Sequence, residues 1–285
     1  MSIPWRVTAS KDGTPILTTD LLASEDRYVL FVGDAHWDHA RCDRAALKRT
    51  LEEAKERNAA IIDIGDLLDV MQGREDRRSS KGALRPEHAT DNYFQSVVQD
   101  AAKWFEPYAE NIAVMLTGNH ETAVGKHQEV NLTTWLASEL KRAGSPVVYG
   151  GYQTYVIFRF VYGKTQHIGI PAWIGHGHGG AAPVTKGVIS AQRRAVTYPD
   201  ARFLVTGHIH QAWSVAHSQL RCNTHGSVTP LEQEHFSVGT FKNEYGDGRS
   251  GWAVEKGFAP SVPSALWARF FVRNKQVHWE FTKSR

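Results

Sequence analysis

Residues 28–36, YVLFVGDAH, begin as an unbroken apolar run and end in a glycine, an aspartate and a histidine. A short apolar run that stops at a glycine is typical of a strand buried on both faces. Residues 43–58 follow with apolar side chains at helical spacing, and residues 59–64 form a second apolar run that ends in Gly65-Asp66. Strand, helix and strand in this order predict parallel pairing through a right-handed crossover.

The same alternation continues outward from this unit. Residues 112–116 form a third apolar run, and the helix before it is predicted to be capped by Thr90. The second half contains more strands: a hairpin of 155–162 and 167–174 around Gly163-Lys164, an apolar run at 201–206, and a closing hairpin of 267–272 and 276–281. We therefore expect one α/β domain over residues 1–285 with a mixed sheet system, in which residues 211–285 supply strands.

Composition excludes several classes of protein. The 285 residues are 41% hydrophobic and 22% charged, which is typical of a globular chain and argues against disorder. No stretch approaches the roughly 18 apolar residues that cross a bilayer, and the first residues have no apolar signal core. Two cysteines are too few for a disulfide framework, so the sequence predicts a cytoplasmic protein without a membrane partner.

Five polar clusters follow strand-like runs, and each begins with a glycine. In open α/β sheets ligands bind beyond the carboxyl ends of the strands, so we expect these clusters to meet in one crevice. Taken singly, each has an ordinary explanation as a turn or a hydrogen-bonded core histidine, but their joint occurrence favours a functional site. The clusters are Gly33-Asp34-Ala35-His36, Gly65-Asp66-Leu67-Leu68-Asp69, Gly118-Asn119-His120-Glu121, Gly175-His176-Gly177-His178 and Gly207-His208-Ile209-His210.

The residue types in these clusters suit metal chemistry. Carboxylate oxygen, amide oxygen and imidazole nitrogen together match divalent ions such as Mn, Fe or Zn. No cysteine lies in any cluster, which excludes a thiolate site. The donors are too numerous for one ion and suit two ions that share a carboxylate.

The ordered clusters from Asp34 to His210 resemble those of the calcineurin-like metallophosphoesterases. The resemblance implies an α/β fold of the metallophosphoesterase type, a β-sandwich of two mixed sheets flanked by helices. It makes residues 28–210 the motif core and implies a dinuclear metal site at the sheet edge. Two divalent ions are the expected cofactors, with Mn as the first choice and Fe, Zn, Ni or Co as alternatives.

The resemblance also implies roles for individual residues. Asp66 is expected to bridge the two ions and to take part in catalysis. His120 is expected to act on the leaving oxygen, with Asp69 or Glu121 orienting it. In the fourth cluster the family pattern favours His176 as the ligand and leaves His178 to contact substrate or to face solvent. The full set of expected ligands is Asp34, His36, Asp66 and His210 for one ion, and Asp66, Asn119, His176 and His208 for the other.

The resulting hypothesis is hydrolysis of a phosphodiester by a metal-bridging hydroxide, on nucleic acid or nucleotides. The basic loop at 72–86 supports it, because arginine forks bind phosphate bidentately and Arg74, Arg77 and Arg78 follow the second cluster. The alternative for these arginines is a solvated loop.

Two other functions compete with the phosphodiesterase hypothesis. One is a phosphomonoesterase or protein phosphatase, and the other is a non-catalytic scaffold of the same fold. The presence of every expected ligand and of His120 disfavours the scaffold. Residues 239–257, rich in glycine, are interpreted either as a loop beside the cleft or as ordinary turns.

Overall fold

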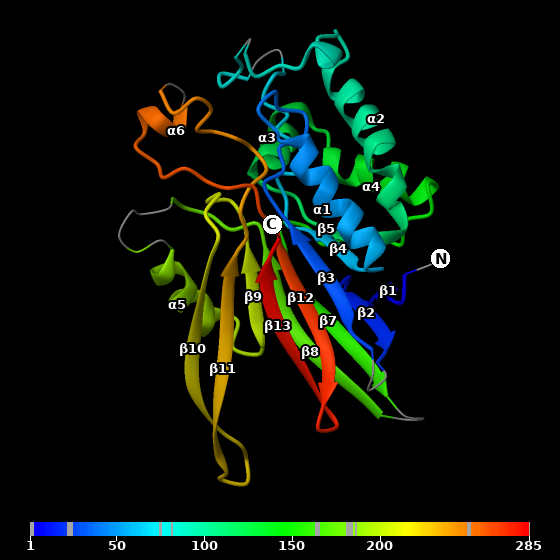
Figure 1. The fold of residues 1–285 in the computed structure, drawn as a ribbon, viewed down its shortest axis with the longest axis vertical. Helices are drawn as coiled ribbons and strands as arrows, with labels where there is room; N and C mark the ends of the chain where they lie inside the picture. Colours follow the sequence, from blue (N-terminus) through cyan, green and yellow to red (C-terminus); the bar gives the residue numbers. More distant parts are fainter. Residues whose placement is uncertain are drawn as a thin grey trace.

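The strands of the protein form two mixed sheets that pack face to face (Figure 1). The structure is a computed structural model that describes residues 3–21, 25–73, 76–80, 82–162, 166–180, 185, 187–249 and 252–284. Helices cover the outer face of one sheet, and a single helix lies along the other. This is the predicted sandwich of two mixed sheets flanked by helices.

The six-stranded sheet is built from the strand–helix–strand crossover units in the first half of the chain. The strand order is β13-β12-β3-β4-β5-β6. Strands β3 to β6 pair in parallel, and the C-terminal hairpin β12–β13 adds two antiparallel strands beside β3. The predicted strands at 28–33, 59–64 and 112–116 are therefore confirmed, as is the closing hairpin. The bounds are β3 (Arg27–Val32), β4 (Ala60–Asp63), β5 (Ile112–Met115), β6 (Val148–Tyr149), β12 (Leu266–Arg273) and β13 (Gln276–Lys283).

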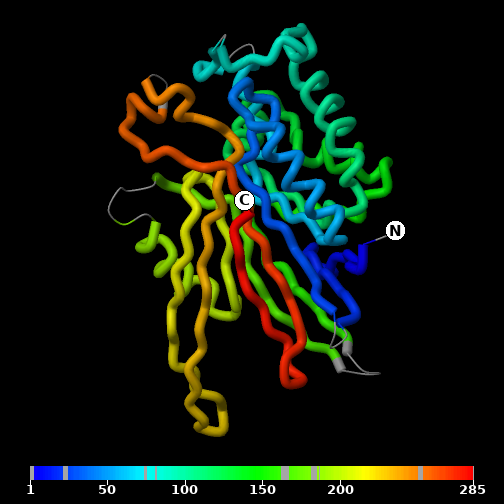
Figure 2. The backbone as a smooth tube through the Cα atoms, viewed as in Figure 1, coloured from blue at the N-terminus to red at the C-terminus, as the bar shows by residue number. Residues whose placement is uncertain are grey.

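The seven-stranded sheet has the order β1-β2-β7-β8-β9-β11-β10. The predicted hairpin β7–β8 is present, and β9 joins β8 in parallel. The two N-terminal strands extend the sheet on one side, and the long hairpin β10–β11 extends it on the other and reaches past the neighbouring strands (Figure 2). The bounds are β1 (Arg6–Ala9), β2 (Pro15–Asp20), β7 (Gln153–Tyr162), β8 (Gln166–Gly175), β9 (Phe203–Thr206), β10 (Trp213–Cys222) and β11 (Val228–Ser237).

The helices follow from local sequence signals with one exception. Asp43 caps the first helix by accepting a hydrogen bond from the amide of Ala46 at 2.8 Å. The prediction that Thr90 caps the second helix is wrong, because this helix begins at Tyr93 with Asn92 at the cap position, and Thr90 lies in the preceding turn, where its amide donates to the carbonyl of His88. The bounds are α1 (Arg44–Glu56), η1 (Pro86–His88), α2 (Tyr93–Phe105), η2 (Glu106–Asn111), α3 (Asn119–Gln128), α4 (Leu132–Arg142), α5 (Val188–Thr197) and α6 (Trp252–Glu255).

Two apolar cores hold these layers together. One lies between the sheets, where the rings of Phe31, Phe158 and Phe203 pack against one another. The other lies between the six-stranded sheet and helices α1, α2 and α4. Residues 211–285 supply strands to both sheets and also α6, whose segment lies at the helical end of the molecule. Among the described residues, no helix has the length and apolar character that a membrane crossing requires.

Candidate metal centre

The five polar clusters meet at one edge of the sandwich. Each follows the carboxyl end of a strand, with β3, β4 and β5 coming from one sheet and β8 and β9 from the other. Backbone hydrogen bonds tie neighbouring clusters together, from the amide of Asp34 to the carbonyl of Gly65 and from the amide of Gly207 to the carbonyl of His176, both at 3.0 Å. The expectation that the clusters share one crevice is thus met by the topology.

The backbone at this edge is held in unusual conformations. Asp34, His36, Asp66, His208 and His210 have φ values of 51°, 47°, 51°, 73° and 56°, in the left-handed region that non-glycine residues seldom adopt. Such conformations persist only where the surrounding structure enforces them, and they concentrate at functional sites.

Two glycines allow the clusters to approach one another. A Cβ atom on Gly118 would lie 2.0 Å from an oxygen of Asp66, and one on Gly207 would lie 2.4 Å from an oxygen of Asp34. Any larger residue would displace these carboxylates, so both positions require glycine.

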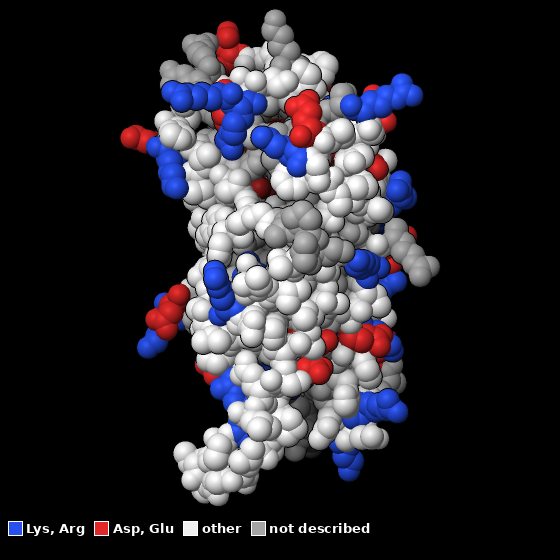
Figure 3. Space-filling view, turned by 90° about the vertical axis from the view of Figure 1, so that its left-hand side faces the viewer, with Lys and Arg blue, Asp and Glu red and all other residues white. Residues whose placement is uncertain are grey.

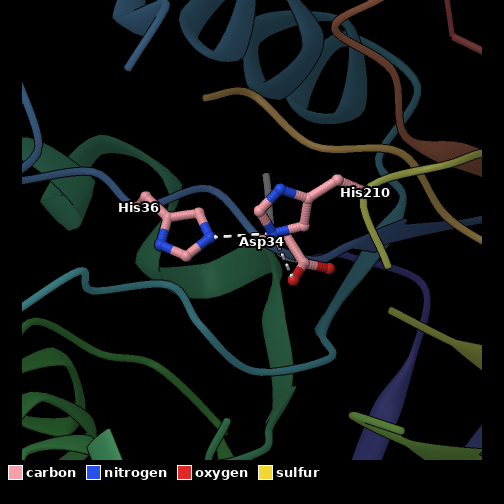
Figure 4. A group of neighbouring side chains, drawn as sticks. All are labelled: Asp34, His36 and His210. Atoms are coloured by element: carbon pink, nitrogen blue, oxygen red, sulfur yellow. Dashed lines mark hydrogen bonds and ion pairs between the residues drawn. The ribbon is translucent and has the colours of Figure 1, made fainter. Parts of the chain in front are cut away.

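Asp34, His36 and His210 form one part of the site, which we call the first half (Figure 4). The Nε2 atoms of the two histidines face each other at 3.2 Å, and His210 Nε2 also lies 3.2 Å from Asp34 Oδ1. The opposite ring nitrogens meet carboxylates: His36 Nδ1 lies 3.1 Å from Asp69, and His210 Nδ1 lies 3.0 Å from Glu244. With a proton on each Nδ1, both Nε2 lone pairs point into the site.

Asp66, Asn119, His176 and His208 form the second half. His176 Nε2 lies 3.2 Å from Asp66 Oδ2 and 3.0 Å from Asn119 Oδ1, and His208 Nδ1 lies 2.7 Å from the same Asn119 oxygen. The other nitrogen of His176 meets the backbone carbonyl of Ile64 at 3.1 Å. The structure therefore places His176 inside the cluster, whereas His178 is exposed and makes no hydrogen bond or ion pair with the described residues.

The carboxylates of the site favour a positive charge between them. Burial by itself lowers the pKa of His210, but Asp34 and Glu244 raise it to about 10. Burial likewise opposes protonation of His176, and Asp66 raises its pKa to about 9. A divalent cation satisfies the carboxylates without protonating the imidazoles. The residues present therefore fit divalent cations, with three groups of ligand atoms that each lie within 4.8 Å of one another.

His120 lies within the cluster and forms one of the three possible ligand groups with His36 and Asp66. Its amide donates to Asp66 Oδ1 at 2.9 Å, and its Nε2 lies 3.7 Å from Asp66 Oδ2. Its Nδ1 is 2.7 Å from the backbone carbonyl of Asp69, so Asp69 contacts this ring. The other residue expected to orient His120, Glu121, is occupied elsewhere, because its buried carboxylate accepts from the amides of Asp66, Leu68 and Gly118.

The arginines of the basic loop differ in how close they come to the metal-binding groups. Arg78 lines a cavity of about 640 Å³ together with His120 and His210, and its guanidinium is paired with Asp76 at 2.7 Å. Arg77 and Arg78 both line a second cavity, beside Phe94, and Arg77 does not line the first. Arg74 lies outside the described residues.

Two residues at the site escaped sequence reasoning. Lys242 Nζ lies 3.0 Å from Asp69 Oδ1, and Glu244 contacts His210 as described above. Both are contributed by the segment after β11. The glycine-rich sequence of 239–257 suggests a loop beside the cleft, but nothing in it distinguishes Lys242 and Glu244 from the other polar residues.

The chain resembles one known family and several solved structures. A family model for calcineurin-like phosphoesterases matches residues 27–212. A structure of vacuolar protein sorting 29 from Cryptosporidium parvum is 14% identical, with 91% of this chain and 98% of that chain covered and a TM-score of 0.38. A predicted phosphoesterase from Streptococcus pneumoniae is 13% identical, with 91% and 90% covered and a TM-score of 0.35. The search of curated proteins found no match.

Proposed function

This chain belongs to the calcineurin-like phosphoesterase family, and from that premise we propose that it is a metal-dependent phosphoesterase acting on phosphodiesters. One observation carries the proposal. Three groups of histidine and carboxylate ligand atoms converge at one edge of the sandwich, with Asp66 in two of the groups and His120 in one of them. Metal-assisted ester hydrolysis uses such an arrangement of shared carboxylate and imidazole ligands.

The two halves of the site assign the ligands. Asp34, His36 and His210 would hold one ion, and Asn119, His176 and His208 would hold the other, with Asp66 shared. Divalent ions bound here would polarise the phosphoryl oxygens and lower the pKa of a coordinated water. Mn²⁺ is the ion we expect, with Fe, Zn, Ni and Co as alternatives.

Asp66 is placed to serve two partners at once. The side chain is buried, Oδ1 accepts from the amide of His120, and Oδ2 faces His176. Its own amide is held by Glu121 at 3.2 Å. The carboxylate is thus fixed before any ligand arrives, which lowers the cost of organising the site around a substrate.

His120 is suited to donate a proton to the leaving oxygen. The carbonyl of Asp69 accepts a hydrogen bond from Nδ1, which keeps a proton on that nitrogen and leaves Nε2 free to exchange its own. The side chain is 12% exposed and borders the 640 Å³ cavity, so a substrate group can reach it. General acid catalysis of this kind contributes about 10²–10⁴-fold.

Two cavities support a diester over a monoester. Both are bordered by His210: the cavity of about 640 Å³ on the side of His120, and one of about 1010 Å³ on the side of Pro260 and Trp267. A phosphodiester has a substituent on each of two ester oxygens and can use both spaces, whereas a monoester uses one. Lys and Arg side chains lie at the helical end of the molecule and also along the rest of this face, with acidic groups among them (Figure 3).

Hydrolysis of two chromogenic esters tests the proposal. The full chain is stripped with chelator and reloaded with Mn²⁺, and turnover of bis(p-nitrophenyl) phosphate is compared with that of p-nitrophenyl phosphate. We expect the diester to be hydrolysed at least as fast, with activity lost in the chelated protein and in Asp66→Asn. Asp12→Asn, at an exposed turn, is the matched control and retains full activity.

Each other result contradicts the proposal. Negligible diester turnover beside the monoester would indicate a phosphomonoesterase. Absence of both activities together with absence of bound metal would indicate a scaffold. For nucleic acid as the substrate, cleavage of an oligonucleotide should be accompanied by binding that weakens steeply between low and moderate salt.

A further inference from the structure

The segment 238–244, which follows β11 and lies beyond the residues matched by the family model, crosses back over the first half of the site. The amide of Val238 donates to the carbonyl of Thr206 at 2.8 Å, and the hydroxyl of Thr240 donates to the carbonyl of Asp34 at 2.7 Å. The amide of Phe241 also donates to the carbonyl of Asp34, at 3.2 Å. The segment is therefore anchored on the backbone of a metal-binding cluster.

Lys242 extends from this anchored segment into the interior. Its amide donates to the hydroxyl of Thr240, and its ammonium lies 3.0 Å from Asp69 Oδ1 and 3.7 Å from Glu244 Oε1. The lysine side chain is only 9% exposed, and that of Asp69 is 1% exposed. A buried ammonium is stable only when paired, and here it stands between two carboxylates.

Each of these carboxylates in turn contacts a histidine of the first half. Asp69 lies 3.1 Å from Nδ1 of His36, and Glu244 lies 3.0 Å from Nδ1 of His210. Lys242 therefore joins two carboxylate–histidine pairs into one continuous arrangement whose ends are the facing Nε2 atoms. This is a feature of three-dimensional placement, since its members come from four separate segments of the chain.

The second half has no equivalent. Nδ1 of His176 contacts the backbone carbonyl of Ile64, and His208 uses its Nδ1 toward Asn119. Among the described residues, neither ring has a carboxylate on its far nitrogen. The two halves thus present similar ligand atoms, but the groups that contact the far ring nitrogens of their histidines differ.

We propose that Lys242 is a positioning residue that holds Asp69 and Glu244 against His36 and His210, and so sets the cation affinity of the first half alone. A carboxylate behind a metal-binding histidine fixes its tautomer and makes the ring a stronger donor. Without the ammonium, the two carboxylates repel each other and lose the group that keeps them in place. The proposal rests on the proposed function only in requiring that the first half binds a cation.

Titration of the metal-free full chain with Mn²⁺, followed by calorimetry and by electron paramagnetic resonance, tests this inference. Asn119→Ala is the background that isolates the first half, and His210→Ala isolates the second. In the first background, Lys242→Met should weaken Mn²⁺ binding about 10–100-fold, the usual cost of losing an outer partner of a metal ligand. In the second background it should change nothing. Lys141→Met, at an exposed position of α4, is the control in both.

Two further variants protect the test against a simple folding defect. Lys242→Arg keeps the charge and should restore most of the affinity, while Glu244→Gln should reproduce the selective loss. If Lys242→Met does not fold in chelator, judged by circular dichroism, Glu244→Gln decides the outcome alone.

The proposal is overturned by equal weakening of both halves, by unchanged affinity of the first half in a folded variant, or by failure of that half to bind Mn²⁺ at all. No substrate is used in these titrations. A selective loss in a protein that hydrolyses no phosphodiester would therefore support this inference and contradict the proposed function.

Discussion

Two segments flank the candidate metal centre, and they differ in how their charged residues are used. The basic loop 72–86 is dense in arginine, yet Arg78 is paired with Asp76 of the same loop and its side chain is 42% exposed. Arg85 donates to the backbone carbonyls of His39 and Cys42 and so braces the loop. Only one of the described arginines of this loop borders the cavity beside His120.

The segment 238–244 has few charges, but it buries them. Lys242 and Glu244 contact residues of the first half and are themselves shielded from solvent. Charged side chains are rarely buried unless paired. The burial of these two residues is therefore stronger evidence for a role at the site than the density of charge in the loop. A run of arginines in a sequence mainly predicts solvent exposure. The tertiary contacts decide which charged side chains reach the metal-binding residues.

The largest effect is expected from substitution of His120, which lies between the two segments. His120 borders the cavity that lies between them, and its substitution by alanine should lower kcat on a diester about 10²–10⁴-fold, because the leaving oxygen loses its proton donor. Mn²⁺ affinity should be unchanged when measured by calorimetry. A variant with full turnover at saturating metal would contradict the role of this residue.

The second effect separates the buried segment from the exposed loop by stability. Thr240→Val removes the hydroxyl that donates to Asp34 and accepts from the amide of Lys242, so the free energy of unfolding should fall by about 1–3 kcal/mol. Ser80→Ala in the loop should change it by less than about 0.5 kcal/mol. Urea denaturation in chelator measures both. Equal effects would remove the distinction between the segments.

A third and smaller effect tests what the loop does contribute. Arg78→Met should raise KM for a diester several-fold, by about 1 kcal/mol or less, because an exposed cation in water gains little from a phosphate. The kcat and the Mn²⁺ affinity should stay at the level of the unmodified protein. An Mn²⁺ affinity that fell with KM would place this arginine in the metal centre and break the comparison. Arg77→Met, which faces the other cavity, serves as the control.

The smallest effect concerns the ion pair inside the loop. The hydrogen bond from Arg78 lowers the pKa of Asp76, so the pair stabilises the fold above the ordinary aspartate pKa and is lost as the pH falls through the lowered value. Arg78→Met should therefore cost at most about 1 kcal/mol at pH 7. The cost should begin to shrink below the ordinary aspartate pKa of about 4, and it should approach zero only at a second pH below the lowered pKa, where Asp76 is protonated in the folded protein. Urea denaturation at the two pH values checks this, and a cost independent of pH would contradict it.

Local signals predicted most of what lies along a single strand or helix. The apolar run before Asp34 folds as a strand and residues 43–58 fold as a helix over Arg44–Glu56, as expected, since each depends on neighbours within a few residues. The prediction for Thr90 was wrong because the turn at 86–88 continues through Thr90 and the helix begins only at Tyr93, and composition does not reveal where such a turn ends. The supporting residues of the site were beyond sequence reasoning for a different reason. Thr240 meets Asp34 across 206 positions of the chain.

The sequence by itself determined the residue types of the site and their positions after strand ends, because glycine, aspartate and histidine at such positions have few other uses in combination. The tertiary structure alone decided how the two halves differ. Whether an imidazole is backed by a carboxylate, an amide or a backbone carbonyl depends on which distant segments pack behind it. Hydrogen bonds from Val238 to Thr206 and from Thr240 to Asp34 hold the segment after β11 so that Lys242 and Glu244 lie behind the first half, and no periodicity or spacing along the chain encodes that contact.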